Sequence, residues 1–562
     1  MTQTKFGEVR KTTDFLIVGG GIAGLTAAVA AKEKNPELRV LIVEKQTAGY
    51  SGKANKGGGV LQYFDLEHMS PEDFVEYHAH EVGCYLGDQE LMKKYVSMNN
   101  ELLDRLESWG VTIPKKRIPT GPMTYMVGVD LDITLKVRKK AEKLGVEIID
   151  KVTVSDLLTD GSRISGAVGY SILDGTFYIL KSSAVLLATG SQNYRIAPMW
   201  SSGRGDGIAA AYRAGAEMRN AEFGNFAQLF KKNSFQEVVF GENYMYNARG
   251  ENVTQNFRRF PEADISSTAI REWYRQMGEG KGPIYLRVPD QGDLMQIWDR
   301  PYGVPFWARD HGKAAGRDPE CEVVPGFVGE QSPLRVDHHM ETTIHGLYGA
   351  GDVCYCGSGA PGAVPAPPGR NRGSGILNAV FNGILGGESA ADFVAETPRG
   401  AVSEEQIAGF RKAVYRPLEN PDGVDPKEVI NLLQDLLCPV ENSIYMSQYR
   451  LDLVLRRLEK VKKLAKKMRA EDFHGVLACH EAEAMVLCAE MQFRAASMRK
   501  ESRGWFLRED YPQMDNDNWL QWIIISNKSG EMTFTTERVP VEQWDVQPYG
   551  RKGEVQNGKQ SV

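Results

Sequence analysis

The chain has 562 residues, more than one hydrophobic core usually supports, so two to four domains of roughly 100–200 residues each are expected. Its charged and hydrophobic fractions, 25% and 42%, are ordinary for a globular protein. A net charge of −6 and a pI near 6.0 argue against a nucleic-acid-binding protein, because phosphate binding needs a concentrated basic surface.

The sequence carries no sign of export or membrane insertion. Residues 1–13 are polar and lack the apolar stretch of a signal peptide. No apolar run approaches the ~20 residues that span a bilayer, so we expect no membrane span and a cytoplasmic location. The seven cysteines are scattered, with Cys354 and Cys356 the only close pair, which fits free thiols in a reducing compartment. No cysteine run typical of an iron–sulfur cluster is present, and no metal site is predicted.

The first elements in chain order form a strand–helix–strand unit. Residues 14–19 are an apolar run that ends in glycines, 23–31 have helical composition, and 40–44 are a second apolar run. This order predicts a βαβ unit with a parallel sheet. A longer helical region follows from about 71 to 109.

Short strands separated by turns follow the helical region. Residues 146–149, 151–158, 166–170 and 184–188 read as strands, with turns at 160–161 and 174–175. They predict a small antiparallel meander that returns to the sheet. Residues 232–325 lose this regularity and indicate an inserted lobe.

After the insert, the strand-like segments 334–337 and 346–351 return to the sheet, and a helix is expected to begin near 374. The segment 403–500 is strongly helical, and the irregular tail contains a predicted hairpin at Ser529-Gly530. The basic run 456–467 within this region has charges at helical spacing. It indicates a solvated helix face or a docking surface for an acidic partner.

The segment Gly19-Gly20-Gly21-Ile22-Ala23-Gly24 matches the G-x-G-x-x-G fingerprint between a strand and a helix. Gly19 would make the tight turn, Gly21 would let the backbone approach a pyrophosphate, and Gly24 would let the helix lie close to the strand. The helix N-terminus supplies free N–H donors to the phosphates. Glu44 is spaced to bind ribose hydroxyls, and its carboxylate would disfavour a 2′-phosphate.

Two later segments favour FAD over NAD. The segment 185–190, Val-Leu-Leu-Ala-Thr-Gly, resembles the second strand-to-turn signature of large flavoproteins. The segment 346–352, Gly-Leu-Tyr-Gly-Ala-Gly-Asp, resembles the late strand whose terminal acid, here Asp352, reaches the ribityl hydroxyls of FAD. A helix N-cap is the alternative role for Asp352.

With these three motifs, the chain resembles the flavoprotein subunits of the fumarate reductase and succinate dehydrogenase superfamily. The resemblance includes residues 203–216, 501–512 and 517–519. It implies an α/β fold with a Rossmann-like FAD-binding domain (1–231 and 326–402), an inserted α+β capping domain (232–325) and a C-terminal helical domain with an irregular tail (403–562). The predicted FAD contacts are Gly19, Gly21, Ile22, Ala23, Gly24, Glu44, Lys45, Ser51, Gly52, Lys53, Gly58, Val152, Ala188, Thr189, Gly190, Asp206, Asp352, Ser374, Gly375 and Ile376.

The chain departs from the family pattern at the flavin linkage. Gly52 stands where the family carries the histidine that bonds FAD covalently, so we expect a non-covalent FAD. The stretch 50–59, together with 279–285, looks more like the alpha subunit of adenylylsulfate reductase.

The family's dicarboxylate clamp also does not appear. The segments that carry its histidines read Phe226-Ala-Gln-Leu229 and Val328-Gly-Glu-Gln-Ser-Pro333, and the segment of its proton-donating arginine reads Glu262-Ala-Asp264. These three losses argue against succinate or fumarate as the substrate.

Flavin chemistry needs a substrate held against the flavin, a cation near the reduced ring and a proton donor. The resemblance offers Arg370 or Arg372 as the anion-binding arginine, although an ion pair between domains would also explain either. His339 is the candidate proton donor, and a histidine in a turn, without a catalytic role, is the alternative interpretation. Its neighbour His338 would face the opposite way on a strand, so at most one of them points at the site. Lys53 is a candidate contact of flavin or substrate.

Cys354 and Cys356 follow the late flavin strand and are open to two interpretations, a redox pair or small buried hydrophobic residues.

Three functions remain open. The first is an FAD-dependent reductase or dehydrogenase of a small anionic or unsaturated substrate, exchanging electrons with a separate iron–sulfur or ferredoxin-like protein. The second is an adenylylsulfate reductase of the alpha type, in which sulfite adds to the flavin. The third is a flavin electron-transfer subunit without a substrate site.

Overall fold

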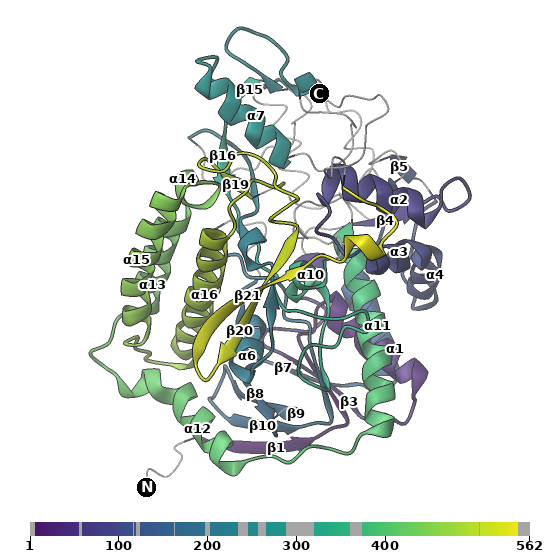
Figure 1. The fold of residues 1–562 in the computed structure, drawn as a ribbon. Helices are drawn as coiled ribbons and strands as arrows, with labels where there is room; N and C mark the ends of the chain where they lie inside the picture. The colour runs from purple at the N-terminus through teal and green to yellow at the C-terminus, as the bar shows by residue number, and fades with distance from the viewer. Residues whose placement is uncertain are drawn as a thin grey trace.

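The computed structural model describes residues 6–55, 59–115, 117–119, 124–161, 163–196, 203–233, 245–256, 266–287, 320–359, 374–504 and 506–548. Figure 1 shows three regions: two sheets with their helices in the lower part, a small lobe at the top, and a helical region along the left side. The chain passes from the first region into the lobe and back before it forms the helical region.

A five-stranded parallel sheet lies at the centre. Its order is β17 (Leu347–Gly349), β11 (Ala184–Leu187), β2 (Phe15–Val18), β3 (Val40–Glu44) and β7 (Glu147–Asp150). Strands β2, β3 and β11 are buried along their whole length, as expected for a parallel sheet covered on both faces. The predicted βαβ unit is therefore confirmed.

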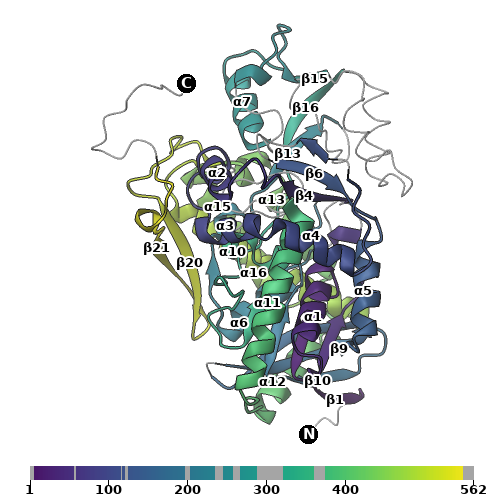
Figure 2. The ribbon, with the colours of Figure 1, turned by 90° about the vertical axis from the view of Figure 1, so that its right-hand side faces the viewer.

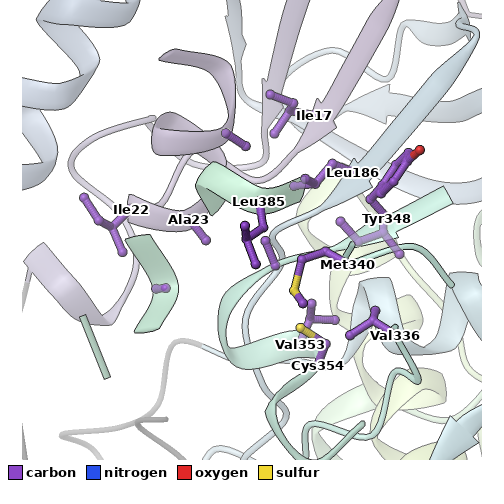
Figure 3. Packing of buried hydrophobic residues seen from close by; sticks show 14 of the residues in the cluster. Ile17, Ile22, Ala23, Leu186, Val336, Met340, Tyr348, Val353, Cys354 and Leu385 are labelled. Atoms are coloured by element: carbon purple, nitrogen blue, oxygen red, sulfur yellow. The ribbon is translucent and has the colours of Figure 1, made fainter. Parts of the chain in front are cut away.

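Helices α1 (Ile22–Lys34) and α11 (Ser374–Glu396) lie side by side against this sheet (Figure 2). Glycines let them approach closely, since a Cβ at Gly383 would lie 2.5 Å from the Ala23 carbonyl oxygen and one at Gly387 would lie 2.3 Å from that of Ala27. Figure 3 shows Ala23 and Leu385 of these helices beside Ile17 and Leu186 of the strands. This packing holds the N-termini of both helices at the carboxyl ends of the strands.

The predicted meander forms a second sheet of order β1 (Glu8–Thr12), β10 (Phe177–Lys181), β9 (Ile164–Ser171) and β8 (Val152–Thr159). Strands β8, β9 and β10 are antiparallel, and β1 adds in parallel to β10. Two details differ from the prediction. The segment near 146–149 joins the parallel sheet as β7, and the polar N-terminal segment forms a strand that the sequence pattern did not indicate.

The helical region predicted for 71–109 is interrupted. It consists of α2 (Pro71–Tyr77), a π-helical turn (His78–Val82), α3 (Gln89–Ser97) and α4 (Asn99–Ser108). Cys84 and Tyr85 have φ of 44° and 66°. These values lie in the left-handed region and are incompatible with a right-handed α-helix, so the chain turns there. A small sheet of β4 (Val60–Phe64), β6 (Thr124–Gly128) and β5 (Arg117–Pro119) packs nearby.

The inserted lobe is α+β, as predicted. Its sheet has the order β13 (Ala227–Lys231), β16 (Glu320–Phe327), β15 (Tyr285–Arg287) and β14 (Met245–Tyr246), all antiparallel. Helix α7 (Ser266–Gly278) packs on β13 and β16. Strands β13 and β16 connect the lobe to the region of the two sheets and therefore form its base.

The C-terminal region is helical, as predicted. Its main helices are α12 (Glu404–Tyr415), α13 (Pro426–Leu437), α15 (Gln448–Ala465) and α16 (Phe473–Met498). The predicted hairpin is formed by β20 (Gln521–Lys528) and β21 (Glu531–Arg538), and Ser529 and Gly530 both have positive φ at its turn. The remaining elements are α5 (Ile133–Lys143), α6 (Asp206–Ala214), β12 (Met218–Arg219), α10 (Tyr355–Ser358), α14 (Val440–Ser443), β18 (Tyr445–Met446), β19 (Leu507–Arg508), and the 3₁₀ turns Ala221–Gly224, Thr254–Asn256, Gly351–Val353, Arg416–Glu419 and Val541–Gln543.

A buried ionic network ties the C-terminal region to the turn Ala221–Gly224. Arg499 bonds Glu222 and Glu501, and Arg503 also bonds Glu501, with all four side chains fully excluded from solvent. Such a network is costly to break because removing one member leaves a buried charge without its partner.

Within the described residues, no helix combines the length and apolar composition needed to cross a bilayer.

The prediction of a strand at 334–337 was wrong. Only an isolated bridge between Met218 and Leu334 forms there, and Asp337–Met340 form a turn.

Candidate functional site

The glycine fingerprint forms a cradle at the N-terminus of α1. Gly19 has φ of 107° and turns the chain out of β2, while a Cβ at Gly24 would lie 2.0 Å from the Gly19 carbonyl oxygen. By contrast, a Cβ at Gly21 would meet no atom within 4 Å. Gly19 and Gly24 are thus required by the turn and the packing, whereas Gly21 leaves open the space in front of the first N–H groups of the helix. That is the geometry of a pyrophosphate site.

Glu44 lies beside this cradle at the end of β3 and is buried. One of its carboxylate oxygens accepts the Gly20 N–H at 2.7 Å, and the other accepts the Gln46 N–H at 2.8 Å. These bonds fix the carboxylate, and each oxygen keeps a second lone pair for a ribose hydroxyl.

The ends of β11 and α11 contribute polar groups that lack partners among the described residues. The Thr189 hydroxyl and both amide atoms of Asn378 are buried without a hydrogen bond. Gly190 has φ of 77° and open space at its Cβ position. Because buried polar groups are normally hydrogen-bonded, these atoms fit a bound polar ligand such as FAD. Asn378 was not predicted from the sequence.

The other predicted contacts at this edge are also placed together. Ala188 donates its N–H to Val18, which sets the end of β11 beside the fingerprint turn. Ser374, Gly375 and Ile376 are the first residues of α11, and the Tyr355 hydroxyl bonds the Gly375 carbonyl at 2.9 Å. Ile22 and Ala23 are the first residues of α1.

Gly52 has φ of 88°, and a Cβ there would lie 3.8 Å from the Gly21 Cα. The position of the lost linking histidine therefore faces the cradle. Ser51 donates its hydroxyl to the Thr47 carbonyl at 3.0 Å. Val152 opens β8, directly after Lys151, whose N–H bonds the Gln46 carbonyl at 3.2 Å.

Lys53 lies at the centre of a buried ionic cluster. Its ammonium bonds the Asp352 carboxylate and the Ser191 hydroxyl, each at 2.9 Å, and the Glu330 carboxylate. Burial alone would lower the pKa of Lys53, but the two carboxylates outweigh it and raise the pKa. Lys53 is therefore charged, and it is bonded to the acid predicted to hold the ribityl chain.

Lys45 lies in a second buried cluster of the same kind. Its ammonium bonds the carboxylates of Asp206 and Glu481, so the first residue of α6 and helix α16 meet at the end of β3. Burial opposes the charge on Lys45, yet these two acids raise its pKa. Glu481 also pairs with Arg195 and Arg204. Lys45 and Asp206, both predicted FAD contacts, thus bond each other.

The two segments that would carry the clamp histidines pair with each other. The N–H groups of Val328 and Gly329 both bond the Phe226 carbonyl at 2.9 Å. Phe226 and Val328 are fully buried apolar residues, and Gln228 is buried beside them on β13. The structure therefore brings these segments together at the base of the lobe, without a histidine in either. The segment Glu262–Asp264 lies outside the described residues.

Two of the three predicted catalytic residues, Arg370 and Arg372, lie outside the described residues, as does the predicted contact Gly58. His339 is an exposed residue of the turn that ends at Met340. His338 bonds Asp88 at 2.9 Å, and that hydrogen bond raises the pKa of His338. Both histidines lie in a turn rather than on a strand, which agrees with the alternative interpretation.

Cys354 and Cys356 are buried free thiols. Burial raises the pKa of both, that of Cys356 to about 12. This is the environment of small hydrophobic residues rather than of reactive thiolates.

The basic run forms the exposed face of α15 and the two residues after it. Six of its cations are exposed, and none of these is in an ion pair with another described residue: Arg456, Arg457, Lys460, Lys463, Lys466 and Lys467. Tyr449 and Leu453 continue this face and are 72% and 37% exposed.

Comparison with known proteins identifies the class. Residues 14–229 match the FAD binding domain family, and residues 441–553 match the family of the fumarate reductase flavoprotein C-terminus. The first match begins one residue before β2 and contains the glycine cradle, Glu44 and Thr189. The chain is an FAD-dependent oxidoreductase.

The curated relatives extend along the whole chain. It is 24% identical to the fumarate reductase flavoprotein subunit of Haemophilus influenzae, covering 97% of each chain. It is 25% identical to the fumarate reductase flavoprotein subunit of Escherichia coli, covering 91% of each chain. The chain is therefore similar along its length to the flavoprotein subunits of fumarate reductases.

Solved structures share the fold. Adenylylsulfate reductase of Archaeoglobus fulgidus superposes with a TM-score of 0.78 at 20% identity, covering 98% of both chains. Quinol fumarate reductase of E. coli gives the same TM-score and identity, covering 97% of this chain and 100% of that chain.

Proposed function

We propose that this protein is an FAD-dependent reductase or dehydrogenase of a small anionic or unsaturated substrate other than succinate or fumarate. One contrast carries the proposal. The residues at the carboxyl ends of the strands fit FAD, whereas the paired segments 226–229 and 328–333 at the base of the lobe contain no histidine. Without those histidines, the segments lack the groups that hold the two carboxylates and deliver a proton in the family.

The roles of the chain's own residues follow from their places. The N-terminus of α1 binds the pyrophosphate through backbone N–H groups, Glu44 accepts from the adenosine ribose, and Asp352 accepts from the ribityl chain. FAD supplies hydride chemistry when bound, and the N-terminus of α11 offers N–H donors and partial positive charge to it. The base of the lobe reaches this edge through Glu330, which bonds Lys53, and the lobe would exclude water from the edge. Because Gly52 replaces the linking histidine, FAD is held without a covalent bond.

We expect a separate iron–sulfur or ferredoxin-like protein to exchange electrons with this flavin. The sequence contains no cysteine run for a cluster, so a second redox group would come from a partner. The exposed cations of α15 are complementary to an acidic protein and would anchor it there. Charge reversal at Arg456, Lys460 and Lys463 should abolish co-purification of the partner without changing the flavin spectrum. Unchanged co-purification would exclude this surface as the anchor.

A second candidate function is that of the alpha subunit of an adenylylsulfate reductase. It is favoured by the likeness of the stretch around Gly52. The third candidate function, that of a flavin electron-transfer subunit without a substrate site, would leave the inserted lobe without a role.

Spectral titrations separate the three functions. The FAD-loaded protein is mixed with sulfite, and in its photoreduced form with adenylylsulfate or with a panel of enoates. We expect reoxidation by a member of the panel and no sulfite adduct. A sulfite adduct together with reoxidation by adenylylsulfate would establish the second function, and no reoxidation by any acceptor would establish the third. Acid precipitation should release the flavin into the supernatant, and flavin in the pellet would disprove non-covalent binding.

A further inference from the structure

The ammonium of Lys53 joins four separate segments of the chain. Lys53 follows the cradle-facing Gly52, Ser191 follows β11, Asp352 follows β17, and Glu330 follows β16 at the base of the lobe. A lysine has three N–H donors, and each of the three partners here accepts one. The side chain is thereby fixed between the sheet and the lobe.

The cluster is deeply buried. The side chains of Lys53, Asp352 and Glu330 are 14%, 13% and 1% exposed, and the ammonium of Lys53 contacts both carboxylates. Charges in such surroundings are screened little by water, so they act strongly on a neighbouring charge. Without Lys53, the two carboxylates would lose the cation that they share at this edge of the sheet.

We propose that Lys53 is a positioning residue for FAD: it holds Asp352 in place for the cofactor and, with Glu330, sets the reduction potential of the flavin. The proposal rests on the function proposed above, since it requires FAD at this edge. The ion pair joins the Asp352 segment to the residue that follows Gly52.

The sign of the effect follows from charge. Reduction adds two electrons and one proton to FAD, so the product carries one more negative charge than the oxidised form. A nearby cation favours that product, and a nearby carboxylate opposes it. Lys53→Met removes the cation and should lower the potential, whereas Glu330→Gln removes a carboxylate and should raise it. The expected order is Glu330→Gln, wild type, Lys53→Met, from highest to lowest.

The test is a dithionite titration of each FAD-loaded variant against a reference dye, with FAD affinity measured separately. For Lys53→Met we expect the affinity for reduced relative to oxidised FAD to fall at least tenfold, which corresponds to about 30 mV for two electrons. The affinity for oxidised FAD should also fall, because Asp352 loses its partner. Lys53→Arg keeps the charge and should restore most of the potential.

Lys45→Met is the matched control. It also removes a buried ammonium between two carboxylates, but beside Glu44 at the ribose end of the cradle. It should weaken FAD binding and leave the potential unchanged. If Lys53→Met does not fold, the double variant Lys53→Met/Glu330→Gln replaces it, because it leaves one buried carboxylate fewer. Its potential is then compared with that of Glu330→Gln, and the difference gives the effect of Lys53.

A Lys53→Met potential equal to that of the wild type, or a shift matched by Lys45→Met, would overturn the inference while leaving the proposed function intact. Failure of the wild-type protein to bind FAD would refute both.

Discussion

Gly21 and Gly24 lie three residues apart in the same fingerprint, yet the structure assigns them different roles, and substituting each by alanine separates binding from folding. Gly21 has φ of −77°, which alanine adopts readily, and its Cβ would enter open space. Gly21→Ala should therefore change the free energy of unfolding by no more than about 1 kcal/mol, a typical helix N-cap effect. The methyl group would, however, occupy the path of the pyrophosphate to the backbone N–H groups.

Loss of one hydrogen bond to a charged group costs about 1.5–3 kcal/mol, so the Kd of FAD should rise roughly ten- to a hundredfold in Gly21→Ala. Gly24→Ala is the matched control, since its Cβ would lie 2.0 Å from the Gly19 carbonyl oxygen and 3.1 Å from the Ile17 side chain. Overpacking of this kind destabilises a fold by about 1–3 kcal/mol or more. Urea unfolding of the FAD-free proteins and fluorescence titration with FAD measure both quantities. Wild-type FAD affinity in Gly21→Ala would refute the assignment of the cradle.

Two further predictions concern stability. Burial lowers the pKa of His78 to about 4 from 6.5, so the unfolded chain binds the proton more readily, and this residue should contribute a loss of about 2 kcal/mol of stability between pH 8 and pH 5. In urea unfolding, the free energy of unfolding of His78→Phe should fall by about 2 kcal/mol less than that of the wild type between these two pH values. The same pH dependence in both proteins would contradict the burial argument. Arg499→Met leaves Glu222 and Glu501 without their shared buried partner and should cost about 3–5 kcal/mol. Adding Glu222→Gln should recover part of that loss, and a simple sum of the two single effects would show that the residues are not coupled.

Local sequence was enough to predict the cradle. Gly19, Gly24 and Glu44 lie within one βαβ unit, where the turn, the close packing and the spacing are all decided by neighbouring residues. The hairpin at Ser529-Gly530 was predictable for the same reason.

Long-range pairing explains what the sequence did not reveal. The first strand, β1, exists because Glu8–Thr12 pairs with Phe177–Lys181, and its polar, half-exposed residues carry no strand signal of their own. Similarly, Lys53 was recognised as a candidate, but its partners Ser191 and Glu330 are 138 and 277 residues away. Nothing in the pattern around Glu330 indicates that it meets a lysine.

For the two histidines the sequence left a strand and a turn open. Residues 334–337 were predicted to be a strand, and its continuation would give His338 and His339 opposite orientations. Asp337 instead accepts the N–H groups of His339 and Glu341, and these side-chain bonds favour a turn over an extended chain. A role for His339 stays a prediction.

Anaerobic mixing of the reduced, FAD-loaded protein with fumarate, followed by flavin absorbance, tests the central claim most directly. That claim is a functional flavin site without the dicarboxylate clamp of the superfamily. Ferricyanide serves as the control acceptor, because it needs no substrate pocket. The account predicts reoxidation by ferricyanide and no reoxidation by fumarate above the rate in buffer. Reoxidation that rises and saturates with fumarate concentration would contradict it.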